Sequence, residues 1–348
     1  MTKVKIVQVG CGKMSKFTMK YALDRGYEIV GAVDINPDIV GKNICEIMET
    51  NESGVNIEPL KALDRLLEDE KPNICIVTTM SLLNDIKEVV RTIVSHKVNV
   101  ITTCEEAFYA KNSNIPVYEE LDILAKANGV TITGCGYQDV FLGNLIAVIA
   151  GSSHNITKIQ GSSSYNVEDY GIALAKAHGA GMTPEEFATS VAASDEISNE
   201  ERQKLISQGE FLPSYMWNTV GWQADRLNLH ITDINQKCVP IIAEEDVYSD
   251  TLQMSIKKGN ALGMSAVVTA HTKENIILEA ECIGKVYLKD EFDKNEWTVF
   301  GEPDTTVTIN RPSTVELTCA DVINRLEDVI EAKPGFVSTS QMNVAMYH

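Results

Sequence analysis

The feature that most constrains this 348-residue chain is a glycine turn that joins an apolar run at residues 4–9 to a helix-like segment. Gly10 permits a tight turn, and Gly12 lets the backbone approach a phosphate. A second apolar run ends in Asp34, where a carboxylate can accept hydrogen bonds from ribose hydroxyls. Strand, glycines, helix and acid in this order predict a dinucleotide-binding unit, with the first N–H groups of the helix aimed at the pyrophosphate.

The residues at this turn and at the end of the second apolar run also predict which cofactor binds. Ser15 stands where the fingerprint has its third glycine and is small enough for close packing of helix and strand. The Asp34 carboxylate repels the extra phosphate of NADP, so NAD is the expected cofactor. Lys42 lies close enough to Asp34 in the sequence to weaken the preference for NAD, so some use of NADP is expected. The expected contacts at the start of the helix are Gly10, Gly12, Lys13 and Met14.

Strand-like and helix-like segments alternate up to about residue 133, which predicts a Rossmann-type α/β domain with a parallel sheet. The expected strands span residues 3–9, 28–33, 74–78, 99–102 and 131–133, and the expected helices begin near residues 13, 39, 62, 83 and 115. Ligands of such sheets bind at the carboxyl ends of the strands. Three residues at or directly after the ends of two of these strands are therefore further expected cofactor contacts: Thr78, Thr79 and Thr103.

The second part of the chain has a different texture. An apolar helix at 141–150 precedes strand-like runs at 156–165, 226–232, 265–271, 276–283 and 305–310, which predict an α+β domain with a largely antiparallel sheet. Thr183, followed by Pro184 and two acids, predicts the start of a helix.

The last helix, expected at 320–332, should return to the first domain. We therefore expect a dinucleotide-binding domain at 1–140 plus 311–348, a substrate and dimerisation domain at 141–310, and the substrate pocket between them.

The composition of the chain limits which binding partners are expected. A net charge of −19 argues against nucleic acid and against an anionic membrane surface, and it suits a cationic substrate. Eight scattered cysteines show no zinc spacing, so no metal site is expected, and they indicate reduced thiols in a cytoplasmic protein. The chain enters a strand at once and no apolar run reaches bilayer length, so neither a signal peptide nor a membrane span is expected.

Two adjacent acids, Glu105 and Glu106, directly follow the expected strand at 99–102. In a nucleotide-binding sheet this position faces the nicotinamide ring, and a carboxylate there can serve as a general base. Neighbouring residues point in different directions, so one acid should face the substrate. We favour Glu105, which is nearer the strand end; the alternative is that both are solvated residues at a helix start.

Two polar segments supply the other candidates. The segment that joins the domains carries Tyr137 and Gln138, which are expected to contact the substrate, and Asp139, a catalytic candidate. Asp139 can equally cap the following helix. Tyr165 and Asn166, expected to bind substrate, end a strand in the second part, with His178 nearby as a catalytic candidate. An ordinary surface loop and a structural histidine are the alternatives for this second group.

Six motifs, at residues 9–14, 33–38, 102–106, 136–141, 178–187 and 331–336, together resemble the 2,4-diaminopentanoate dehydrogenase family of amine dehydrogenases, which is related to dihydrodipicolinate reductase. The resemblance covers nearly the whole chain. It implies NAD(P)-dependent oxidative deamination of 2,4-diaminopentanoate to 2-amino-4-oxopentanoate, with release of ammonia, in ornithine fermentation. It also implies a small cationic diamino acid as substrate and a homodimer.

Other functions of the same architecture fit the residues less well. Dihydrodipicolinate reductase-like imine reductases carry paired histidines, and no two of the six histidines here are adjacent. Related sugar dehydrogenases usually show Glu-Lys-Pro where this chain has Cys-Glu-Glu at 104–106. A non-enzymatic NAD-binding redox sensor would not need the predicted polar cleft. A carboxylate at this position attracts an ammonium group and can accept its proton, which favours an amine dehydrogenase.

Overall fold

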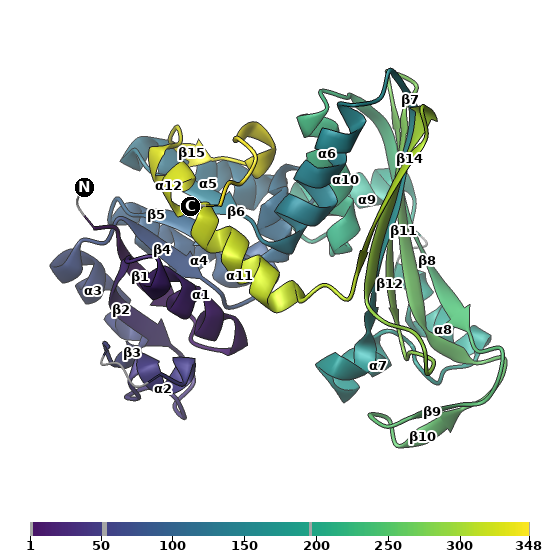
Figure 1. Cartoon of the computed structure of the whole chain (residues 1–348), viewed down its shortest axis with the longest axis horizontal. Helices are drawn as coiled ribbons and strands as arrows, with labels where there is room; N and C mark the ends of the chain where they lie inside the picture. Colours follow the sequence, from purple (N-terminus) through teal and green to yellow (C-terminus); the bar gives the residue numbers. More distant parts are fainter. Residues whose placement is uncertain (1–2, 51–53, 195–196, 348) are drawn as a thin grey trace. The chain divides into compact units, whose positions relative to one another are not determined.

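The computed structural model describes residues 3–50, 54–194 and 197–347, which form two compact units (Figure 1). The first unit comprises Met1–Asn144, Ile206–Phe211 and Ser313–His348. The second comprises Leu145–Leu205 and Leu212–Pro312. The C-terminal segment, yellow in Figure 1, therefore belongs to the same unit as the N-terminal strands.

The first unit is built on a seven-stranded parallel sheet in the order β15-β6-β5-β4-β1-β2-β3. The strands are β1 (Lys5–Val9), β2 (Glu28–Asp34), β3 (Ile57–Pro59), β4 (Ile74–Val77), β5 (Asn99–Thr102), β6 (Thr131–Gly134) and β15 (Gly335–Phe336). This order confirms the predicted Rossmann-type fold. The short edge strands β3 and β15 were not expected, because two or three residues carry no readable alternation.

Helices cover both faces of this sheet. They are α1 (Lys13–Asp24), α2 (Ile44–Met48), α3 (Leu63–Glu70), α4 (Leu83–Ser95), α5 (Ile115–Asn128), α11 (Thr314–Asn324) and α12 (Leu326–Glu331), with short turns of helix at Leu60–Ala62, Glu105–Phe108, Ala110–Asn112, Gln138–Asn144 and Thr339–Gln341. On one face, α3, α4 and α5 pack against residues such as Val7 and Val77. On the other face, α1, α11 and α12 pack against residues such as Ile6 and Ile76.

The helix expected near residue 39 is wrong. Residues 37–42 form turns, Gly41 has a φ of +91°, and α2 begins only at Ile44. Asn43 fixes that start, because its side chain accepts a hydrogen bond from the N–H of Cys45 at 3.1 Å.

The second unit holds a six-stranded mixed sheet in the order β14-β13-β7-β12-β11-β8. Its strands are β7 (Asn155–Asn166), β8 (Ile231–Ile242), β11 (Ala261–Thr272), β12 (Ile277–Lys285), β13 (Lys294–Glu302) and β14 (Thr305–Asn310), and a hairpin is formed by β9 (Val247–Ser249) and β10 (Met254–Ile256). Only β7 and β12 pair in parallel within this sheet. The predicted α+β class of the second part is confirmed.

The helices of this unit are α6 (Leu145–Ala150), α7 (Ile172–Ala177), α8 (Pro184–Ser190), α9 (Asn199–Gln208), whose end belongs to the first unit, and α10 (Tyr215–Arg226), with short helical turns at Val167–Tyr170 and Ala192–Ser194. The predicted start of α8 is confirmed, since Thr183 and Glu186 form a reciprocal capping box. The strand expected at 226–232 starts five residues later than expected, because α10 extends to Arg226 and the chain turns at Asn228, where φ is +54°, so that β8 begins only at Ile231. Within the described part of the chain, no helix combines the length and apolar character needed to cross a bilayer.

Candidate functional site

The turn between β1 and α1 has the backbone that a pyrophosphate needs. Gly10 has a φ of +85°, and a Cβ at this residue would lie 2.8 Å from the carbonyl oxygen of Thr78. Gly12 precedes the first turn of α1, and a Cβ there would meet no atom within 4 Å. The first N–H groups of a helix, here those of Lys13 and Met14, have no partner within the helix itself. Open space beside these groups fits a phosphate.

Ser15 and Asp34 complete this site. The fully buried Ser15 hydroxyl donates to the carbonyl of Gly12 at 2.7 Å, which suits a position where the fingerprint has a glycine. Asp34 ends β2, and its two oxygens accept the N–H groups of Cys11 at 2.5 Å and Asn36 at 2.7 Å. A carboxylate offers about four acceptor positions. Asp34 can therefore also accept ribose hydroxyls, and the residues around this turn fit NAD.

A buried glutamine that the sequence analysis missed holds the turn in place. The Gln8 side-chain nitrogen donates to the Gly10 carbonyl at 2.9 Å and to the Thr78 hydroxyl at 2.8 Å, and its oxygen accepts from the Thr18 hydroxyl at 2.9 Å. These bonds link β1 to β4 and α1. The available signal was an amide side chain inside an otherwise apolar strand, since a buried polar group needs partners.

The three threonines predicted as cofactor contacts follow adjacent strands. Thr78 and Thr79 come directly after β4, and Thr103 comes directly after β5. The strand order β5-β4-β1-β2 places them along the same edge of the sheet as Gly10 and Asp34. Thr79 is exposed, whereas Thr78 and Thr103 are half-buried.

Glu105 opens a short helical turn that begins just beyond β5. It lies at the carboxyl edge of the sheet that also carries the glycine turn, and its side chain is exposed. The surrounding protein raises the pKa of its carboxyl by desolvation, an effect that is limited where solvent reaches the group. An exposed carboxylate at this edge can meet a small cationic ligand.

Glu106 is placed differently from its neighbour. Its side chain is only 3% exposed, and its oxygens accept the Leu83 N–H at 2.7 Å and the Ser113 hydroxyl at 3.1 Å. Leu83 is the first residue of α4, so Glu106 satisfies one of the free amides of that helix. Burial raises the pKa of Glu106, while these hydrogen bonds oppose the shift.

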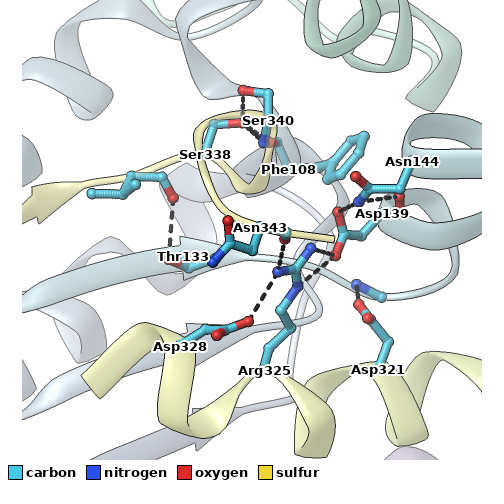
Figure 2. Close-up of polar contacts among 12 residues, drawn as sticks. Phe108, Thr133, Asp139, Asn144, Asp321, Arg325, Asp328, Ser338, Ser340 and Asn343 are labelled. Atoms are coloured by element: carbon cyan, nitrogen blue, oxygen red, sulfur yellow. Dashed lines mark hydrogen bonds and ion pairs between the residues drawn. The ribbon is translucent and has the colours of Figure 1, made fainter. Parts of the chain in front are cut away.

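Asp139 lies in a fully buried ion pair with Arg325 (Figure 2). Its Oδ2 accepts a hydrogen bond from Arg325 Nε at 2.8 Å and lies 2.7 Å from Arg325 Nη2 in the ion pair, and its Oδ1 accepts from the Asn144 side chain at 2.8 Å. Arg325 also donates to Asp328 at 3.0 Å and to the carbonyl of Asn343. Asp139 is thus enclosed within the first unit, and its carboxylate oxygens bond to the side chains of Arg325 and Asn144.

The polar face of α11 holds the segment that contains the predicted substrate contacts Tyr137 and Gln138. The Thr318 hydroxyl accepts the Tyr137 N–H at 3.1 Å, and Asp321 accepts the Gly136 N–H at 3.0 Å. Thr318, Asp321 and Arg325 follow one another at the spacing of one helix face. The Tyr137 ring is buried and stacks on Phe141 with centroids 4.7 Å apart, while Gln138 is half-buried.

Asp321 gives this cluster a predicted pH dependence. Burial and the neighbouring Asp139 raise the pKa of Asp321 well above its usual value, against the opposing effect of Arg325. The folded state then binds the proton more tightly than the unfolded chain, so this group's contribution is greatest at low pH and is lost as pH rises from about 4 through the folded pKa. In Asp321→Asn, the free energy of unfolding should fall less steeply with pH, by up to about 1.4 kcal/mol per unit over that range.

Chemical denaturation at a series of pH values between 5 and 9 measures this difference. The asparagine oxygen can still accept the Gly136 N–H, so the variant removes the titration and keeps the hydrogen bond. Equal slopes for the native protein and the variant would show that Asp321 does not take up a proton on folding.

Tyr165 and His178, predicted separately, meet in the second unit. Tyr165 Oη lies 2.6 Å from His178 Nε2, and His178 Nδ1 lies 2.9 Å from the carbonyl oxygen of Leu174. Asn166, the next residue of β7, instead accepts the Glu168 N–H at 3.2 Å through its side chain. No sequence signal linked Tyr165 to His178, because the contact depends on how α7 packs on the helical turn at Val167–Tyr170 that follows β7.

Residues 3–50, 54–194 and 197–347 contain no group of three or more His, Cys, Asp or Glu side chains placed to hold a metal ion. All eight cysteines are buried free thiols.

Comparison with known proteins adds to this geometry. The family model described as "2,4-diaminopentanoate dehydrogenase C-terminal domain" matches residues 140–347. The 2,4-diaminopentanoate dehydrogenase of Acetoanaerobium sticklandii is 26% identical over 193 residues, which are 55% of this chain and 54% of that protein. The chain thus aligns with about half the length of that curated relative.

Solved structures extend the likeness to the whole chain. The amine dehydrogenase of Mycobacterium smegmatis is 30% identical, with a TM-score of 0.82 over 100% of this chain and 98% of that one. A dihydrodipicolinate reductase from Paenisporosarcina sp. TG-14 is 11% identical, with a TM-score of 0.52 over 97% and 99% of the two chains. The second likeness shows a common fold only.

Proposed function

Because the chain belongs to the 2,4-diaminopentanoate dehydrogenase family, we propose that it is an NAD(P)-dependent amine dehydrogenase that converts 2,4-diaminopentanoate to 2-amino-4-oxopentanoate. The reaction consumes water and releases ammonia, and we assign it to ornithine fermentation in the cytoplasm, a compartment that suits eight free thiols. The observation that carries the proposal is the exposed Glu105 carboxylate at the sheet edge that bears the glycine turn.

The residues divide the chemistry as follows. Bound NAD would supply the hydride acceptor, held at the glycine turn and by Asp34. The Glu105 carboxylate attracts the ammonium group of the substrate and takes its proton, which leaves a neutral amine able to lose hydride. Loss of hydride leaves an iminium group, and Glu105, after its first proton has passed to solvent, takes a proton from the water that adds to this group. Glu105 then returns that proton to the amino group of the carbinolamine, which leaves as ammonia while the hydroxyl loses its proton to form the ketone. Glu106 holds the segment in place through α4.

A substrate panel tests this function. Purified protein with NAD should form NADH from 2,4-diaminopentanoate, and more slowly from 4-aminopentanoate, while releasing one ammonia per NADH. A sugar such as myo-inositol serves as the comparison, because sugar dehydrogenases have the same architecture. NADH formation from the sugar and from no amine would overturn the proposal.

We predict that Asp34 sets a preference for NAD. In Asp34→Ser, the ratio of kcat/KM with NADP to that with NAD should rise by about tenfold or more, because the carboxylate no longer repels the extra phosphate. Steady-state kinetics with both cofactors measure the ratio. A native enzyme that strongly prefers NADP would contradict this assignment, as would an unchanged ratio in the variant.

We also propose a homodimer formed through the sheet of the second unit. α6 and α10 pack on one face of this sheet. Along β12, alternate residues are buried, while those between them, such as Glu279 and Ile283, stay partly exposed on the other face. A second copy would cover that face. Light scattering during size-exclusion chromatography should give twice the chain mass, and a monomer at assay concentration would refute the proposal.

A further inference from the structure

The hydrogen bonds of His178 fix which of its ring nitrogens carries a proton. Nδ1 lies 2.9 Å from the carbonyl oxygen of Leu174, which can only accept, so Nδ1 must be the donor. Burial lowers the pKa of His178, which favours the neutral ring. In a neutral imidazole with a proton on Nδ1, Nε2 has a lone pair and can only accept.

This tautomer decides the role of the tyrosine. Tyr165 Oη lies 2.6 Å from His178 Nε2, so the tyrosine must donate its single hydroxyl proton to the histidine. Any other group that meets this oxygen therefore has to be a donor. The ring of Tyr165 is held from the side as well, by an edge-on contact with Tyr170 at a centroid distance of 5.6 Å.

A glycine in the neighbouring strand makes room for the pair. A Cβ on Gly284 of β12 would lie 2.5 Å from His178 Cδ2 and 2.8 Å from Tyr165 Oη. Neither atom is at the free end of a flexible side chain, so a larger residue would have to displace the pair. The absence of a side chain at Gly284 is thus part of this arrangement.

We propose that the Tyr165 oxygen, fixed as an acceptor by His178, recognises a protonated amino group of the substrate and discriminates it from a carbonyl. An ammonium group brings three donors to this oxygen, whereas a ketone brings only acceptors and is repelled by it. Tyr165 is then a specificity-determining residue and His178 its positioning residue. The inference rests on the proposed amine dehydrogenase function and adds the group that selects the amine.

The test measures a ratio of affinities. Calorimetry on the full chain saturated with NADH, in buffer free of ammonia, gives the Kd of 2,4-diaminopentanoate and of 4-oxopentanoate, which has no amino group. The native protein should prefer the amine. In Tyr165→Phe and in His178→Phe, that preference should fall by about tenfold or more, because a hydrogen bond to a charged group is lost. His178→Phe retains the phenol but frees its proton to point at the ligand.

Two further variants separate this role from a structural one. In His178→Gln, an amide oxygen can still accept the tyrosine proton, so most of the preference should return. Gly284→Ala removes no polar group, yet it should lower the preference by displacing the pair. Tyr170→Phe is the matched control and should keep the native ratio. A variant that merely loosened the fold would weaken both ligands together and leave the ratio unchanged.

The outcomes are distinct from those for the proposed function. A native protein that binds both ligands equally would overturn the inference, and so would unchanged ratios in Tyr165→Phe and His178→Phe. His178→Gln behaving like His178→Phe would also overturn it. Failure of the proposed function appears elsewhere, as an absence of NADH formation from every amine tested. Repeating the titration with 4-aminopentanoate, which lacks the amino group at C2, shows which amino group the Tyr165 oxygen contacts. If Tyr165→Phe still lowers the preference for the amine, the oxygen contacts the amino group at C4, which is the one that reacts.

Discussion

Replacing Glu105 with Gln is expected to lower kcat for amine oxidation by about 100-fold or more, because the amide keeps the shape of the side chain and removes the base. NAD affinity should be nearly unchanged, since the residues that fit the phosphates and ribose lie at the turn after β1 and at the end of β2. Steady-state kinetics and a fluorescence titration with NADH measure the two quantities.

Glu106→Gln is the matched control. The Glu106 carboxylate is occupied by the Leu83 N–H and the Ser113 hydroxyl, so the substitution should lower Tm and change kcat much less. If the two variants show the reverse order, the role of base passes to Glu106. If neither slows deamination, the base does not lie on this segment, and the other predicted acid–base residues, Asp139 and His178, have to be tested in its place.

The parts of the fold that could be predicted are those whose chemistry is local. The strand, the glycine turn and the helix that follows it occupy adjacent residues, and Gly10 needs its positive φ whatever the rest of the chain does. The capping box at Thr183 is equally local, since its partner is three residues away. Such signals gave the class of both units.

The parts that could not be predicted depend on residues far apart in the sequence. Two neighbouring acids differ in their surroundings, because Leu83 and Ser113 bond to Glu106 while Glu105 is exposed. Asp139 meets a partner 186 positions further along the chain. A single sequence does not show which distant residues contact each other. It can therefore identify an acid as a candidate, but it does not show whether that acid faces solvent or a buried cation.

The boundary errors have a physical cause of the same kind. The segment at 226–232 contains leucine and isoleucine at positions that suit a strand, but its first residue completes α10. Asn228 then adopts a left-handed conformation that ends any regular element. α10 also packs against β11 and β12, and such contacts between distant residues lie outside the local pattern.

The buried pair of Asp139 and Arg325 leads to the largest expected effect on stability. Both side chains are 0% exposed, so Arg325→Met leaves the carboxylate of Asp139 without a counter-ion in a site closed to water. Loss of one partner of such a pair costs about 3–5 kcal/mol of the free energy of unfolding. Urea denaturation followed by circular dichroism measures the loss.

The double variant Arg325→Met with Asp139→Asn separates the unpaired charge from the loss of packing. Both single changes remove the ion pair, but the double variant leaves no unpaired charge on Asp139, and the new amide can still bond to Asn144. It should therefore be more stable than Arg325→Met alone, although one residue more has been changed. A loss below about 1 kcal/mol in Arg325→Met would instead match an exposed ion pair. In that case water reaches the ion pair.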